Sequence, residues 1–194
     1  METSRLSALQ DNVNVTLENL SKARENAGGA AAALRGLVSL EQREWNDNEM
    51  EEQLRYGLTY GPEFFPELNV YDDLKNSGEL ALLTNPELRR SLASMEASLD
   101  QVRFAQADLI TVMQLNFDPY LIAHFDLRWL YESITELADV TEVSKSSLEF
   151  TSEMEFQNLV IFKLDMVELI EVALQETETA LMAVQQSIES QLAE

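Results

Sequence analysis

Hydrophobic residues recur every three or four positions over three long stretches of the chain, which is the spacing of one side of an α-helix. The first stretch covers residues 4–40, the second residues 86–117 and the last residues 153–192. In the last stretch, the pattern places Phe162 and Leu169 on the buried side. The sequence therefore predicts two very long helices and a third helix between them.

Two polar or flexible features interrupt these patterns. Gln106 occupies a position where the second stretch calls for an apolar residue, so it either fixes the helix register or lines an internal site, and either requires a hydrogen-bond partner. Gly28 and Gly29 mark a kink in the first helix or a close approach by another element. The run of alanines at residues 30–33 favours close packing.

Residues 71–85 form the most sharply punctuated part of the chain. Gly78 is expected to end a short helix in the left-handed conformation. Asn85 is expected to cap the next helix, with Pro86 at its first position and Glu87 at the positive end of the helix dipole. We interpret this stretch as a junction between helices.

A family resemblance rests on the pattern Tyr71-x-x-Leu74-Lys75-x-Ser77-Gly78-x-Leu80, followed by Asn85-x-x-Leu88-Arg89. The pattern resembles the signature of a large group of bacterial membrane-anchored proteins of unknown function. Members carry one transmembrane helix near the N-terminus and a helical domain outside the cytoplasm, which implies a periplasmic or other extracytoplasmic location. This sequence departs from the family because no apolar run reaches the ~18 residues of a membrane span. We expect that the anchor has been removed; a cytoplasmic location is the alternative.

Pro119 is incompatible with a regular helix through its position, and Asp118 before it is a candidate N-cap, so we expect a break or kink there. Residues 119–138 then predict short helices. The expected fold is all-α: a single domain over residues 1–194, built as an antiparallel bundle of three to four helices with two very long helices, a kinked third and short connecting helices.

The charge of the chain excludes some partners. It contains 35 acidic and 13 basic residues, for a formal charge of −22, which repels nucleic-acid phosphates and anionic lipid headgroups. We therefore expect no nucleic-acid partner and no membrane insertion by these residues. The charge itself indicates solubility, and a cationic partner or divalent cations are the alternative.

Residues 41–70 predict a long irregular connection rich in aromatic residues. Its rings, with Tyr71, form either a lid over the apolar end of the bundle or a surface for a ligand or partner. The aromatic residues concerned are Tyr56, Tyr60, Phe64, Phe65 and Tyr71.

Candidate chemistry is sparse. The chain has no cysteine and one histidine, His124, which we expect to be partly buried and structural. Arg89 and Arg90 are adjacent cations in an acidic chain; they either pair with carboxylates of the chain or recognise a small anion or a partner carboxylate. We expect no cofactor and no metal site.

These features favour a non-enzymatic domain that acts in protein–protein interaction or small-molecule sensing. A sensor would bury its ligand between helices near Gln106 and the aromatic residues. An interaction module would expose an apolar strip on the first or last long helix and bind a partner or form a homodimer through it. The alternative is a carboxylate- or metal-dependent hydrolase.

Overall fold

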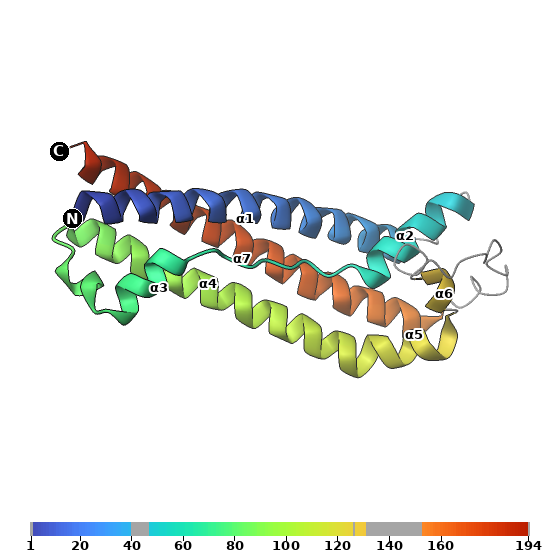
Figure 1. The fold of residues 1–194 in the computed structure, drawn as a ribbon. Helices are drawn as coiled ribbons and strands as arrows, with labels where there is room; N and C mark the ends of the chain where they lie inside the picture. The colour runs from blue at the N-terminus through green and yellow to red at the C-terminus, as the bar shows by residue number, and fades with distance from the viewer. Residues whose placement is uncertain (1, 40–46, 126, 131–152, 194) are drawn as a thin grey trace. The chain divides into compact units, whose positions relative to one another are not determined.

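The structure is a computed structural model that describes residues 2–39, 47–125, 127–130 and 153–193, and the regular elements in these ranges are helices (Figure 1). The all-α fold expected from the sequence is confirmed. In chain order the helices are α1 (Glu2–Val38), α2 (Asp47–Thr59), α3 (Asn69–Asn76), a 3₁₀ helix (Glu79–Leu82), α4 (Pro86–Val112), a π-helix (Met113–Phe117), α5 (Asp118–His124), α6 (Leu127–Leu130) and α7 (Met154–Leu192).

The chain folds as two compact units. Unit 1 contains residues 1–25, 63–105 and 170–194, and unit 2 contains residues 26–62 and 106–169. The helices α1, α4 and α7 each contribute one part to each unit.

In unit 1, the first part of α1 runs antiparallel to the last part of α7, because residue numbers that rise along α1 meet numbers that fall along α7. The side-chain pairs that join the two helices are Gln10 with Glu189, Asn14 with Gln185, and Arg24 with Glu178. Beneath these polar pairs, buried apolar side chains form the core, each contributing roughly 1.5–3 kcal/mol when fully removed from water. The core includes Leu9, Val13, Leu20, Met95, Leu181, Val184 and Ile188.

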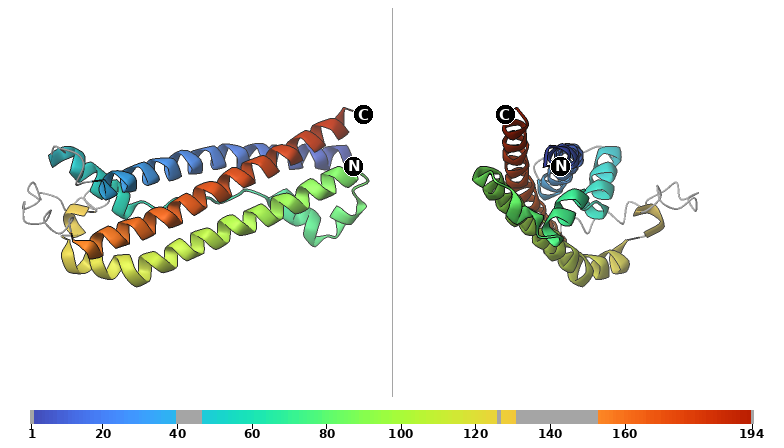
Figure 2. Two further views of the ribbon diagram at one scale, coloured as in Figure 1. Left: turned by 180° about the vertical axis from the view of Figure 1, so that it is seen from behind. Right: turned by 60° about the vertical axis from the view of Figure 1, so that its left-hand side comes forward.

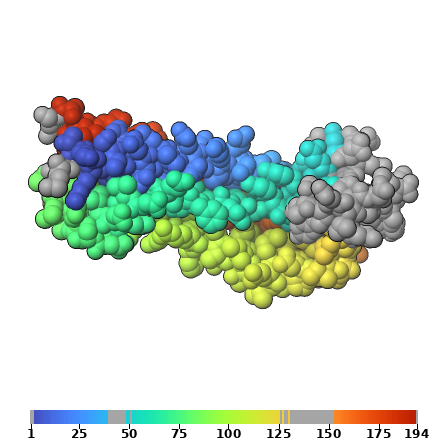
Figure 3. Space-filling model, viewed as in Figure 1, coloured from blue at the N-terminus to red at the C-terminus, as the bar shows by residue number. Residues whose placement is uncertain are grey.

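Residues 63–83 of unit 1 lie against α1 on the face shown in Figure 3 and are held there by side chains of that helix. The buried hydroxyl of Thr16 donates to the carbonyl oxygen of Glu67 (2.9 Å), and the side-chain oxygen of Asn12 accepts from the backbone N–H of Val70 (2.8 Å). These two bonds satisfy backbone groups that lie outside any helix ladder.

The helix stop and start that the sequence predicts within unit 1 are both formed. Gly78 has φ = 77°, in the left-handed region, and follows the C-terminal end of α3. Its N–H donates to the carbonyl oxygen of Lys75 (3.1 Å), and α4 then begins at Pro86.

In unit 2, the last part of α1 again runs antiparallel to α7, with Arg35 bound to Glu168 (2.7 Å) and Gln157 donating to the carbonyl oxygen of Leu37 (3.4 Å). Figure 1 shows α2 beside the end of α1. The contact is close because α2 places Gly57 there: a Cβ atom at Gly57 would lie 3.1 Å from Leu37 Cδ1.

The presence of α2 corrects one expectation. Residues 41–70 were expected to be irregular, whereas residues 47–59 form a helix; residues 41–46 lie outside the described part. Met50, Leu54 and Leu58 recur every four residues, but this pattern is short, and the acidic run beside it and Gly57 within it argue against a helix. Close packing of Gly57 against α1 stabilises this helix in addition to the local pattern.

The region around Pro119 also differs from the expectation. Asp118 is not an N-cap, because it has helical dihedral angles and α4 passes through the π-helix directly into α5. A π-helix shifts the backbone hydrogen-bond pattern by one residue, which accommodates a proline that donates no N–H. Short helices were expected over residues 119–138: α5 begins one residue earlier, at Asp118, and α6 lies inside this range, of which residues 126 and 131–138 lie outside the described part.

The buried side of α7 in unit 2 is rotated from the expected one. Phe162 and Leu169 are 44% and 50% exposed, whereas Val160, Lys163 and Val167 are buried. Apolar residues lie all around this part of the helix, so their spacing is compatible with more than one buried side. The side that is buried contains Lys163, and a lysine is normally taken as a sign of an exposed side.

Candidate functional site

The first turn of α4 forms one wall of a surface pocket in unit 1. The expected N-cap is confirmed, because the side-chain oxygen of Asn85 accepts hydrogen bonds from the backbone N–H groups of Glu87 (2.8 Å) and Leu88 (3.2 Å). This cap occupies two of the free N–H groups at the helix start. The pocket is therefore faced mainly by side chains rather than by unpaired backbone amides.

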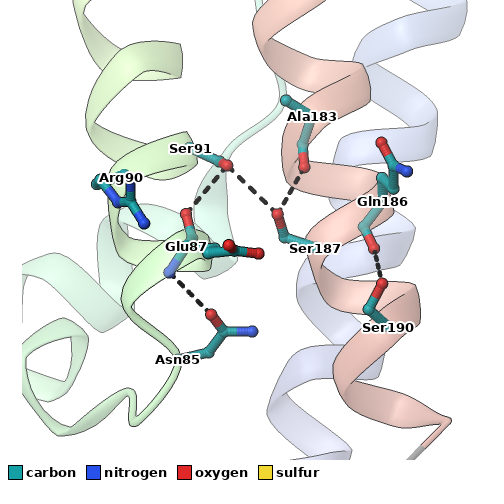
Figure 4. Close-up of a pocket in the computed structure, with 8 residues that line it drawn as sticks. All are labelled: Asn85, Glu87, Arg90, Ser91, Ala183, Gln186, Ser187 and Ser190. Carbon is teal, nitrogen blue, oxygen red and sulfur yellow. Dashed lines mark hydrogen bonds between the residues drawn. The ribbon is translucent and has the colours of Figure 1, made fainter.

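The last turns of α7 form the opposite wall. The hydroxyl of Ser187 donates to the carbonyl oxygen of Ala183 (2.8 Å), and that of Ser190 donates to the carbonyl oxygen of Gln186 (2.9 Å). Across the gap, the hydroxyl oxygens of Ser91 and Ser187 lie 3.3 Å apart, and either hydroxyl can donate to the other in place of its bond to a backbone carbonyl. Figure 4 shows these groups turned toward the space between the two helices.

The pocket has a volume of about 380 Å³. Its lining is almost entirely polar and combines one cation, one carboxylate, two amides and three hydroxyls. The lining residues are Asn85, Glu87, Arg90, Ser91, Ala183, Gln186, Ser187 and Ser190. This set offers both donors and acceptors to a small polar molecule. It contains no histidine or cysteine that would activate a serine as a nucleophile.

Arg90 is the charged group that distinguishes the pocket. Its Nε donates to the carbonyl oxygen of Pro86 (3.3 Å), and neither Arg90 nor Arg89 forms an ion pair with a carboxylate of the described residues. Of the two alternatives for this pair, the described part does not show the first, an ion pair with carboxylates of the chain. Other basic residues do pair with carboxylates: Arg5 with Glu79, Arg24 with Glu178, Arg35 with Glu168, Lys75 with Glu96 and Arg103 with Asp100.

The structure distributes the eight residues expected to form a binding surface over both units. Tyr56, Tyr60 and Gln106 belong to unit 2, whereas Phe64, Phe65, Tyr71, Arg89 and Arg90 belong to unit 1. Of the eight, only Arg90 lines the pocket.

In unit 2, Tyr56 and Tyr60 stack with ring centroids 4.9 Å apart and an interplanar angle of 8°. The hydroxyl of Tyr56 also lies against Gly29, where a Cβ atom would come within 3.0 Å of it. The expected close approach at the glycine pair is thereby confirmed, with α1 continuous through it. Gln106 is half-buried and donates to the carbonyl oxygen of Pro62 (3.3 Å), which supplies the partner it was expected to need.

In unit 1, Phe64 is buried and Phe65 is 74% exposed, so the two neighbouring rings do not form one surface. Tyr71 is buried, and its hydroxyl donates to Glu96 (2.8 Å), which Lys75 also contacts. Burial, together with this carboxylate, raises the pKa of Tyr71. The bonds from Lys75 and Tyr71 lower the pKa of Glu96. The three residues anchor α3 to α4.

Lys163 in unit 2 was not predicted from the sequence. Its side chain is fully buried, Nζ donates to the carbonyl oxygen of Leu58 (2.8 Å), and Nζ lies 5.4 Å from the centre of the Phe117 ring. Burial lowers the pKa of Lys163 to about 7, against a smaller upward effect of Asp118. Its position within an otherwise apolar stripe is the signal that would have identified it.

Tyr120 and His124 form a second polar feature of unit 2. The ring centroids lie 4.3 Å apart, and His124 is exposed, so the expectation that it is partly buried is wrong. The hydroxyl of Tyr120 is buried without a hydrogen-bond partner among the described residues. Burial raises the pKa of Tyr120 to about 12, with smaller contributions from Glu153 and Glu155.

The sequence matches no protein-family model, and comparisons with curated proteins and with solved structures give no significant match. Within the described ranges, no helix combines the length and apolar character needed to cross a membrane. The same ranges contain no cluster of three or more histidine, cysteine, aspartate or glutamate side chains suited to hold a metal ion.

Proposed function

We propose that the chain is a non-enzymatic binding domain and that the Arg90 pocket recognises a small polar ligand bearing a carboxylate or similar anionic group. The observation that carries this proposal is the state of Arg90. In a chain with 35 acidic residues, Arg90 is one of the residues that line a polar pocket, and it forms no ion pair with any described carboxylate. A guanidinium binds carboxylates through two parallel hydrogen bonds, which gives it both affinity and orientation.

The remaining lining residues suit a ligand with hydroxyl or amino groups in addition to its anionic group. Ser91, Ser187 and Ser190 offer hydroxyls at positions fixed by hydrogen bonds to the backbone, and Glu87 offers an acceptor for an amino group. We expect Glu87 to disfavour ligands with several negative charges and to favour zwitterionic or singly charged ones.

A hydrolase remains the alternative. It would need at least two carboxylates gathered in a cleft, and the pocket contains one, Glu87. The binding proposal therefore accounts better for the residues that line it.

The location of this binding activity follows the family resemblance at residues 71–89. We propose that the domain is the extracytoplasmic part of a membrane-anchored bacterial protein, where it would meet small solutes outside the cytoplasm. This part of the proposal rests on the resemblance alone.

The experiment is isothermal titration of the purified chain with glutamate, succinate and gluconate, repeated with Arg90→Gln and with Arg89→Gln as a matched control. Both arginines are exposed, and only Arg90 lines the pocket. We expect binding of at least one singly charged or zwitterionic probe, a loss of about tenfold or more in affinity for Arg90→Gln, and little change for Arg89→Gln. Equal losses in the two variants, or no binding by any probe, would overturn the proposal.

A further inference from the structure

A strip of large apolar side chains lies exposed on α7 in unit 2. The first two residues and the last two are each seven positions apart, and the middle two are neighbours, so the four spread over roughly 100° of the helix circumference and roughly 22 Å of its length. The members of this apolar strip and their exposed fractions are Met154 (78%), Ile161 (48%), Phe162 (44%) and Leu169 (50%). The rear view in Figure 2 shows the course of this part of α7, in orange. The strip is therefore a helix side without a described partner.

Two exposed polar residues, Asn158 and Asp165, lie among the members of the strip on the same side of the helix, and Asp165 brings negative charge into it. Asp165 is exposed and lies between Phe162 and Leu169 on the same side, three residues after the first and four before the second. Glu155 is exposed next to Met154. The only basic residue in residues 154–169 is Lys163, which is buried on the opposite side, so no cation on this part of α7 faces the strip.

This arrangement of charge discriminates between partners. A second copy of the chain would bring Asp165 against like charges and would add to the repulsion between two molecules of formal charge −22. A partner helix with apolar residues at spacings of three and four, and with lysines or arginines placed opposite Asp165 and Glu155, would cover the strip and pair with both carboxylates.

We propose that the apolar strip on α7 is the docking surface for a basic amphipathic helix of a partner protein. The surface shares no residue with the Arg90 pocket, so this proposal does not depend on the ligand. Phe162 is the central anchor, because it is the largest side chain of the strip and is next to Asp165 along one side of the helix.

The experiment uses the whole chain and a fluorescein-labelled 18-residue peptide of leucine and lysine that forms an amphipathic helix, with binding measured by fluorescence anisotropy at near-physiological salt. The variants are Phe162→Ala, Leu169→Ala and Asp165→Asn. The matched control is Met182→Ala, which removes an apolar side chain of α7 that is 56% exposed and belongs to unit 1. Circular dichroism verifies that each variant keeps its helix content.

We expect Phe162→Ala and Leu169→Ala each to weaken binding about fivefold or more, and Met182→Ala to leave it unchanged. Asp165→Asn should weaken binding and reduce its salt dependence. Equal affinities of Phe162→Ala, Leu169→Ala and the control would show that the peptide binds the acidic chain without using the strip, and would overturn the proposal. Absence of binding, or a homodimer in native mass spectrometry that Phe162→Ala dissociates, would overturn it as well.

Discussion

The ammonium group of Lys163 donates a hydrogen bond to the carbonyl oxygen of Leu58 at 2.8 Å, and this bond joins α7 to the end of α2 inside unit 2. The amine has an aromatic ring, Phe117, on one side and no carboxylate in ion-pair contact within the described residues. A buried cation so poorly compensated loses its proton more readily than one in water.

This burial makes stability depend on pH. The pKa of Lys163 is about 7 in the folded chain and 10.5 when the side chain is in water, so between these values the unfolded chain binds more protons. Stability should therefore rise with pH through this window. The Lys163→Met variant has no amine at this position, so its stability lacks this dependence on pH. The melting temperature of the variant should therefore rise less than that of the wild type between pH 7 and pH 9.5. Parallel melting curves, followed by circular dichroism, would contradict the assignment.

The two adjacent glycines of α1 should respond differently to alanine. A Cβ at Gly28 meets nothing within 4 Å, so Gly28→Ala should stabilise the chain by roughly 0.5–1 kcal/mol through helix propensity. A Cβ at Gly29 would come within 3.0 Å of the Tyr56 hydroxyl, and the ring must shift. We expect Gly29→Ala to gain less or to destabilise. Denaturant unfolding of both variants tests this, and equal gains would show that Tyr56 moves away freely.

Removal of the cap at α4 should lower stability. Asn85→Ala leaves the N–H groups of Glu87 and Leu88 without their acceptor and should cost about 1 kcal/mol. Thr84→Ala, one residue earlier and exposed, should change stability by less than about 0.5 kcal/mol. Urea denaturation of the pair gives the difference, and equal values would show that water caps the helix as well as Asn85 does.

The cost of replacing Gly78 should depend on how readily the new residue adopts a positive φ, and not on the room for its side chain. No atom lies within 4 Å of a Cβ built there, and φ is +77°. Gly78→Val should therefore lower the free energy of unfolding by about 1–2 kcal/mol. Gly78→Asn should lower it by less, because asparagine adopts left-handed angles more readily. Differential scanning calorimetry compares the two; the same melting temperature for both would argue against backbone strain.

The features that the sequence predicts correctly are local. Asn85 and Gly78 act through hydrogen bonds and dihedral angles within a few residues, so their patterns are readable without the fold. The long helices are likewise encoded by spacing that repeats over many turns. These features require no knowledge of what packs against them.

The features that the sequence does not predict depend on residues far apart in the chain. Ser91 and Ser187 lie together across the pocket although they are 96 positions apart in the sequence, and a local sequence pattern cannot predict such a pair. Helix α2 depends on Gly57 fitting against α1. The burial of Lys163 was not predicted, because a lysine beside a row of apolar residues normally marks the exposed edge of a helix. The carbonyl group that accepts its hydrogen bond belongs to Leu58 of another helix, α2.

Unit 1 is built from three separate segments of the sequence, and this determines when its residues become available during synthesis. Its three stretches include residues 1–25 at one end of the sequence and residues 170–194 at the other, whereas unit 2 is complete at residue 169. A ribosome therefore makes every residue of unit 2 before it makes the α7 part of unit 1. Until that part emerges, buried side chains of α1 such as Leu9 and Val13 lack a third of their unit's chain segments. The unit that begins the sequence is the last to be completed.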